Sequence, residues 1–243
     1  MKSIKIASYL FFGVLMLFPV LSQASAYWME IKENRHLNAP VNIELVYGNI
    51  DELGIRHRQT GKELLLAGAF TFQLFSPKGS ITQLKMVQKS DCWQMNFLPT
   101  ENGEYRIVGI NCTHPVVDRS ASGGENILPI DYLCGQYLIG TASPQGKPVQ
   151  FLDLLVQQQG KTINIKAFRD KKREQAKTKL RVFNPENWEK ELILNENGEA
   201  VFSATMEGMY NIRMDWSDLK SGNFKGVAYT SIRHRCNFCL FIE

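Results

Sequence analysis

Phe97-Leu-Pro-Thr-Glu-Asn-Gly103-Glu-Tyr105-Arg-Ile107 and Phe202-Ser-Ala-Thr-Met-Glu-Gly208-Met-Tyr210-Asn-Ile212 are two distant stretches of the chain that share one pattern. Each begins with Phe, passes through a polar turn to Gly-x-Tyr, and ends in an apolar alternation. Self-similarity of this kind indicates one structural unit used twice, and here the unit is a strand, a corner and a second strand. The chain is therefore predicted to be all-β and duplicated.

The glycine and tyrosine of each stretch indicate the type of β-domain. In immunoglobulin-like sandwiches a Tyr near the start of a late strand bonds its hydroxyl back across the corner, and a preceding Gly tolerates the turn conformation. We therefore expect two tandem immunoglobulin-like β-sandwiches. The chain has 243 residues. Removal of the N-terminal leader described below leaves enough for two domains of about 105 residues each, which is the size of such a sandwich.

The N-terminus predicts export from the cytoplasm. Lys2 and Lys5 precede an apolar run over residues 9–21, which is followed by Ala24-Ser-Ala26. This order is typical of a secretory signal peptide, and the run is shorter than the ~20 apolar residues that a spanning helix needs. We predict a signal peptide over residues 1–26, a mature chain from Tyr27 without a membrane span, and a periplasmic location. A retained anchor and an extracellular location are the alternatives.

Turn-forming residues place the domain boundary near residue 142. Thr141-Ala-Ser-Pro-Gln-Gly146 precedes a fresh run of strand patterns, so the predicted domains are residues 27–141 and 142–243. Residues 152–159 fit a helix or a strand, and residues 120–127 fit a long loop between strands. The strand candidates are 41–47, 69–75, 81–87, 92–98, 105–110, 162–168, 179–183, 191–194, 200–204, 210–216 and 226–241.

Charge and motifs argue against two functional classes. The formal net charge is +4, and it falls to about +2 when the leader with its two lysines is removed, which is too weak for a phosphate-binding surface. We therefore expect no nucleic-acid partner. The chain has no Gly-x-Ser-x-Gly, no His-Glu-x-x-His and no Gly-rich phosphate loop, so we predict that it is not an enzyme.

Two short motifs offer soft metal ligands. Cys112-Thr-His114 and His234-Arg-Cys236 both have i, i+2 spacing, which in an extended strand points both side chains to one face. Imidazole and thiolate suit Zn, Cu or Ni. The predicted metal ligands are therefore Cys112, His114, His234 and Cys236, although the two pairs come from different halves.

The cysteines allow a different interpretation. In an oxidising compartment they would form disulfides with one thiol left over; they are Cys92, Cys112, Cys134, Cys236 and Cys239. Cys236-Asn-Phe-Cys239 also has the spacing of a redox or metal motif. On a straight strand, however, positions i and i+3 face opposite sides, so these two thiols are not expected to share a ligand.

The layout resembles a family of bacterial periplasmic proteins called domain of unknown function 4198. Trp28-Met-Glu30 matches the start of the mature family members, residues 41–48 match an apolar strand that ends in Gly, and both Gly-x-Tyr corners are present. The family's early His is Tyr27 here, and its Gly-His is Gly48-Asn49. The resemblance implies immunoglobulin-like domains and a role in nickel or cobalt uptake, with a metal permease or an outer-membrane receptor as the partner.

Two functional hypotheses follow from the sequence. The first is a periplasmic binding protein for a transition metal ion (nickel, cobalt, zinc or copper) that supports uptake. The alternative is a non-catalytic interaction or structural module of the cell envelope that binds a protein or a glycan, since sandwich folds often serve this purpose.

Overall fold

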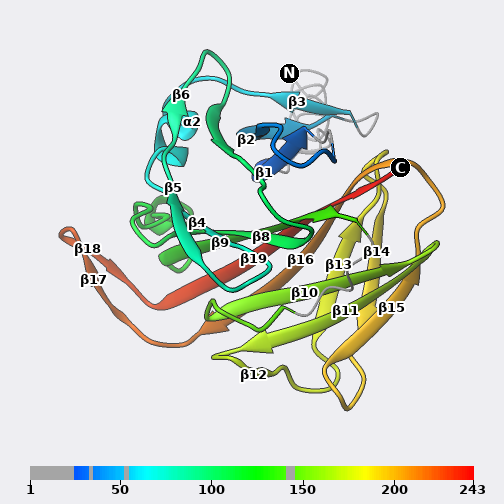
Figure 1. The fold of residues 1–243 in the computed structure, drawn as a ribbon. Helices are drawn as coiled ribbons and strands as arrows, with labels where there is room; N and C mark the ends of the chain where they lie inside the picture. Colours follow the sequence, from blue (N-terminus) through cyan, green and yellow to red (C-terminus); the bar gives the residue numbers. More distant parts are fainter. Residues whose placement is uncertain (1–24, 33–34, 52–54, 141–145) are drawn as a thin grey trace, which may run out of the picture.

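The computed structural model describes residues 25–32, 35–51, 55–140 and 146–243, and these form a nearly all-β structure (Figure 1). Residues 1–24 of the predicted signal peptide (residues 1–26) and the predicted boundary between residues 141 and 142 lie outside the described residues, whereas Ser25 and Ala26 belong to the first strand. No helix of the described part is long and apolar enough to cross a membrane.

A central sheet of eight strands joins the two halves of the chain, in the order β14-β13-β16-β19-β9-β8-β4-β5. Every neighbouring pair is antiparallel except β19 and β9, which run parallel (Figure 1). The strands are β4 (Thr71–Phe75), β5 (Ile81–Leu84), β8 (Gly103–Asn111), β9 (Ile127–Ile139), β13 (Lys179–Phe183), β14 (Glu189–Ile193), β16 (Gly208–Asp218) and β19 (Ser231–Ile242).

The first half closes a core on one face of this sheet. Its own sheet has the order β1-β2-β7-β6, with β3 added to β2, and the short helix α2 (Lys62–Ala67) lies beside it. Met29, Leu45 and Ile107 are among the fully buried residues of this core. The strands are β1 (Ser25–Lys32), β2 (Val41–Ile50), β3 (Arg56–Arg58), β6 (Val87–Gln88) and β7 (Trp93–Phe97).

The second half closes a separate core on the other face. Leu152, Ile165 and Ile212 are fully buried there. In its own sheet β11 pairs with β10, β12 and β15; these strands are β10 (Leu152–Gln159), β11 (Thr162–Arg169), β12 (Lys172–Arg173) and β15 (Glu199–Ser203). A hairpin of β17 (Gly222–Phe224) and β18 (Val227–Tyr229) projects from the body (Figure 1).

The two Gly-x-Tyr corners are equivalent, as the repeated pattern predicts. The Tyr105 hydroxyl accepts hydrogen bonds from the backbone N–H groups of residues 100 and 101, both at 3.0 Å. The Tyr210 hydroxyl accepts from residues 205 and 206 at 3.1 and 3.0 Å. Gly103 and Gly208 have φ angles of 133° and 116°, which favour glycine. A Cβ on Gly103 would meet Pro77, and one on Gly208 would meet Pro185. The prediction of two tandem immunoglobulin-like sandwiches is confirmed.

The structure also differs from the sequence-based expectations. The longest strand, β9, was not expected, because no strand was predicted over residues 127–139. Residues 120–127 were assigned to a loop; in the structure β9 begins at Ile127, and residues 120–122 form a 3-10 turn. Residues 152–159 form the strand β10. The predicted strand over residues 226–241 is divided into β18 and β19. Because both faces of β9 are covered by cores, its sequence lacks the alternation that marks a half-exposed strand.

Candidate functional site

The four predicted metal ligands do not meet. Cys112 and His114 lie beyond the end of β8 rather than in a strand, and Cys112 is exposed whereas His114 is buried, so the expected shared face of this pair is wrong. His114 Nε2 lies 3.1 Å from Asp131 Oδ2, and the imidazole ring stacks on Tyr27 at 5.5 Å. Both contacts place His114 on the side of the first core.

The second pair lies on the opposite face of the central sheet. His234 and Cys236 do share a face of β19, as their spacing predicts, and both are buried. His234 stacks on Tyr132, with its Nδ1 3.0 Å from the Tyr132 hydroxyl, and burial lowers the pKa of His234. Tyr132 follows Asp131 in β9, so the two side chains point to opposite faces, and the sheet separates His234 from His114. Among the described residues, no group of three or more His, Cys, Asp or Glu side chains is placed to hold a metal ion.

All five cysteines are free thiols in this structure, so it contains none of the expected disulfides. Cys134 Sγ lies 3.6 Å from Cys236 Sγ. Cys236 belongs to the second core and Cys239 to the first, which agrees with the expectation that they face opposite sides. Burial raises the pKa of Cys239 to about 12 and that of Cys236 well above its ordinary value. Neither thiol is poised for redox or metal chemistry.

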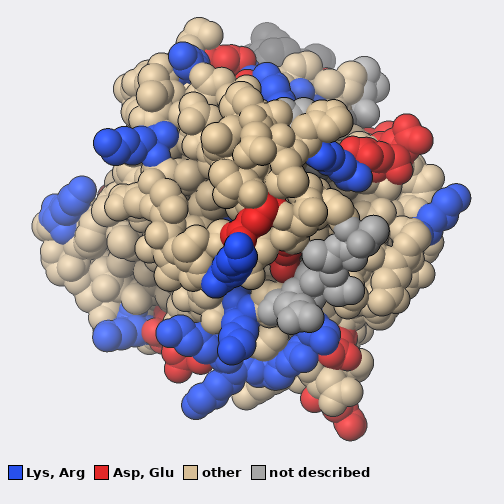
Figure 2. Space-filling view, viewed as in Figure 1, with Lys and Arg blue, Asp and Glu red and all other residues tan. Residues whose placement is uncertain are grey.

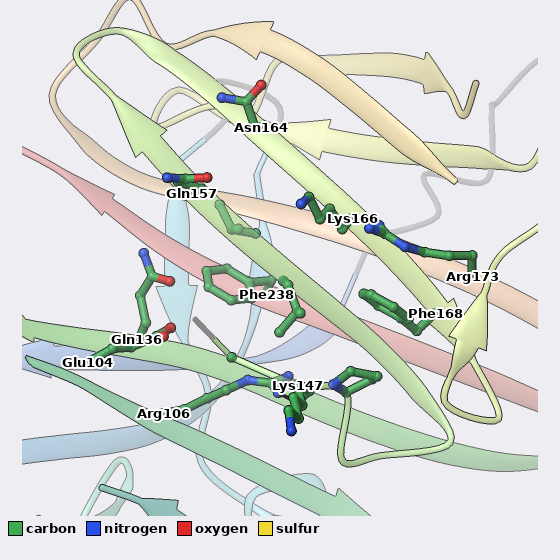
Figure 3. A pocket seen from close by; sticks show the side chains of 14 residues that line it. Glu104, Arg106, Gln136, Lys147, Gln157, Asn164, Lys166, Phe168, Arg173 and Phe238 are labelled. Carbon is green, nitrogen blue, oxygen red and sulfur yellow. Dashed lines mark hydrogen bonds between the residues drawn. The ribbon is translucent and has the colours of Figure 1, made fainter. Parts of the chain in front are cut away.

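A cleft with both apolar and polar lining lies where the edge of the second sheet crosses the central sheet (Figure 3). Its volume is about 280 Å³, and we call it the β10 cleft. Figure 3 shows polar side chains from several strands arranged around Phe238. The lining residues are Glu104, Arg106, Gln136, Gly146, Lys147, Pro148, Leu155, Val156, Gln157, Asn164, Lys166, Phe168, Arg173 and Phe238.

A buried ion pair holds the two walls of the β10 cleft together. Arg106 of β8 donates to the carboxylate of Asp153 in β10 and to the carbonyl oxygen of Lys147 at 2.6 Å. Asp153 is completely buried and also accepts from the backbone N–H groups of residues 149 and 150. Burial lowers the pKa of Arg106, but the charge and hydrogen bond of Asp153, together with the charges of Cys134 and Glu104, raise it by more, and the net pKa is raised. The buried ion pair fixes β10 against β8.

Amide side chains line one side of the β10 cleft. Gln136, Gln157 and Asn164 come from β9, β10 and β11, and each is half-buried. Figure 3 shows them along one side, with Phe168 and Arg173 along the other. An amide both donates and accepts hydrogen bonds. The cleft can therefore bind groups that do both, such as hydroxyls.

Two of the cations at the cleft share one carboxylate. Lys166 and Arg173 both lie within 4 Å of Glu199, at 3.8 and 3.5 Å. Figure 2 shows Lys and Arg side chains gathered over the lower part of this face, near β11 and β12, with acidic side chains among them. The cleft therefore offers cationic hydrogen-bond donors beside its amides.

The sequence contained a partial indication of this site. Arg106 and Asp153 are charged residues inside apolar strand patterns, and a charge that a fold buries needs a partner. The three amides carried no comparable indication, because isolated Gln and Asn residues are common on exposed strand faces.

Comparison with known proteins adds little beyond the fold. No protein-family model and no curated protein matches the chain. The D0-D1 domain of intimin is 8% identical, with coverage of 90% of this chain and 100% of that one and a TM-score of 0.26. A tetra-tandem repeat from the extending region of a large adhesion protein is 10% identical over 89% of this chain and 49% of that one, with a TM-score of 0.26. Latent PorU from Porphyromonas gingivalis is 8% identical, with coverage of 91% of this chain and 21% of that one and a TM-score of 0.23.

Proposed function

We propose that this protein is a non-catalytic binding module of the cell envelope that holds a glycan in the β10 cleft. The observation that carries the proposal is that Gln136 from β9 of the central sheet and the cross-strand pair Gln157 and Asn164 from β10 and β11 line one cleft. Sugar hydroxyls donate and accept, and amides match both roles. The cleft is slightly smaller than the ~300–1000 Å³ of typical pockets for drug-sized ligands, which suits a short stretch of a glycan.

The composition of the cleft favours binding over hydrolysis. Glycosidases use two carboxyl groups that flank the scissile bond, about 5–9.5 Å apart. Glu104 is the one carboxylate among the residues lining the cleft. Asp153 beneath them is engaged by Arg106 and two backbone N–H groups. Among the described residues, the lining also contains no Ser, Thr, Cys or His that would act as a nucleophile.

The test is a glycan array probed with the purified chain, followed by calorimetry with the best glycan. Gln157→Ala combined with Asn164→Ala should weaken binding by about 1–3 kcal/mol, since two net hydrogen bonds are lost. Gln88→Ala is the matched control, because Gln88 is exposed on β6 in the other half. Full affinity in the double variant, or release of shortened sugars from the bound glycan, would contradict the proposal.

A further inference from the structure

A second cavity lies on the opposite face of the central sheet, between that sheet and the first-half sheet. Its volume is about 240 Å³, and we call it the His114 pocket. His114 and Asp131 form part of its wall, beside Arg233 and Arg235. Apolar and aromatic side chains supply much of the rest: Ala26, Tyr27, Tyr47, Leu66, Pro115, Val117 and Pro129.

Hydrogen-bond donors stand in a row along β19 in this pocket. Arg233, Arg235 and Asn237 occupy alternate positions and therefore share one face of the strand, and all three line the pocket. Arg213 pairs with Asn237 across the sheet, and its Nε donates to the Asn237 side-chain oxygen at 2.9 Å. The planar guanidinium group of arginine can donate two parallel hydrogen bonds, which suits carboxylates and other oxyanions.

Carboxylates contact both arginines that line the pocket. Asp131 lies 3.7 Å from Arg233, and Asp215 accepts from Arg235 Nε at 2.6 Å. The lining itself carries two guanidiniums, Arg233 and Arg235, and two carboxylates, Glu63 and Asp131, so their formal charges balance.

The burial of these arginines has two visible effects. Burial, together with the charge of Arg235, lowers the pKa of Arg213 to about 10 and also lowers the pKa of Arg233. In addition, Arg233 Nε is buried and has no hydrogen-bond partner among the described residues. A buried donor without an acceptor is costly, so an incoming acceptor at this position would be stabilising.

We propose that the His114 pocket binds a small ligand that carries one carboxylate on an apolar body. The carboxylate lies against Arg233 and Arg235 and supplies the acceptor that Arg233 Nε lacks, whereas the second negative charge of a phosphate would be repelled by Glu63 and Asp131 of the same lining. The apolar body packs against Tyr27, Tyr47 and the neighbouring prolines. This site is separate from the β10 cleft, because the central sheet lies between them.

The test uses the full chain with three probes at constant ionic strength: benzoate, its neutral isostere benzamide, and inorganic phosphate. Benzoate should raise the thermal unfolding midpoint and bind saturably by calorimetry, and benzamide and phosphate should do neither. Arg233→Gln should weaken benzoate binding by about tenfold or more, as expected for a lost charge-assisted hydrogen bond. Arg181→Gln is the control, because Arg181 forms an exposed pair with Glu189.

Chemical modification of the protein without substitutions keeps the proposal testable if the Arg233→Gln variant does not fold. Phenylglyoxal modifies accessible arginines, and benzoate should protect Arg233 and Arg235 but not Arg181. Equal stabilisation by benzamide, stabilisation by phosphate alone, or no protection of Arg233 would overturn the proposal.

Discussion

Replacing Tyr105 by Phe tests whether the corner hydroxyl stabilises the sandwich as the structure indicates. The hydroxyl accepts from the N–H groups of Thr100 and Glu101 and donates to the Glu101 carbonyl oxygen at 3.1 Å. Each hydrogen bond contributes about 0.5–1.5 kcal/mol net. Because Thr100 is exposed and Glu101 half-buried, water replaces part of what is lost. We therefore expect Tyr105→Phe to reduce the free energy of unfolding by about 1.5–3 kcal/mol.

The second corner provides an internal comparison. The Tyr210 hydroxyl has two backbone hydrogen bonds where Tyr105 has three, so Tyr210→Phe should cost less, about 1–2 kcal/mol. Urea denaturation followed by tryptophan fluorescence, under reducing conditions, gives both values. Tyr229→Phe on the projecting hairpin is the control and should leave stability unchanged. A loss below about 0.5 kcal/mol at Tyr105, or an equal loss at Tyr229, would refute the reasoning.

Three further predictions concern buried ionisable groups. Asp153→Asn should lower the free energy of unfolding by about 3–5 kcal/mol, because Arg106 then keeps a buried charge without a counter-charge; chemical denaturation measures this. In the reduced native protein, Ellman's reagent should react rapidly with exposed Cys112 and not with Cys239, whose pKa burial raises to about 12. Burial lowers the pKa of His234, so its contribution to stability is complete above the unfolded pKa of ~6.5 and declines as the pH falls below it. His234→Phe should remove this part of the pH dependence in urea titrations between pH 8 and 5.

One specific result would contradict each of these three predictions. Unchanged stability in Asp153→Asn would show that the ion pair does not hold β10 in place. Rapid labelling of more than one thiol in the native state would contradict the burial of the other cysteines. A pH dependence identical in His234→Phe and in the parent chain would mean that another group is responsible.

The duplicated corners made the architecture predictable from the sequence. Gly103 and Gly208 need positive φ angles, and both tyrosine hydroxyls accept from the corresponding backbone N–H groups of their corners. Both requirements are local, so they leave a pattern in the sequence. The alternating strand β11 was predictable for the same reason, since one of its faces is more exposed than the other.

The strand that joins the halves was not predictable from such local rules. Residues 127–139 of β9 serve two cores at once: Leu133 belongs to the first and Tyr132 to the second. A strand buried on both faces has no polar period. Its pairing with β19 links positions far apart in the chain, which no spacing rule reveals.

The candidate sites were less predictable than the fold. The spacing of Cys112-Thr-His114 predicted a shared face, but the chain leaves the strand at Asn111, so the rule for extended backbone did not apply. The spacing rule succeeded at His234 and Cys236, which do lie in β19. Neither pair's position relative to the central sheet could be inferred from spacing, and that position decides whether their side chains meet.

The parallel pairing of β9 with β19 has a consequence for how the molecule is made. Residue 127 pairs with residue 231, so the edge of β9 over residues 127–135 that pairs with β19 stays open while roughly a hundred intervening residues are synthesised. Long-range pairing of this kind slows folding, and open edges invite self-association. Chaperone protection would matter most in that interval, and expressing either half alone should yield aggregates rather than a stable fragment.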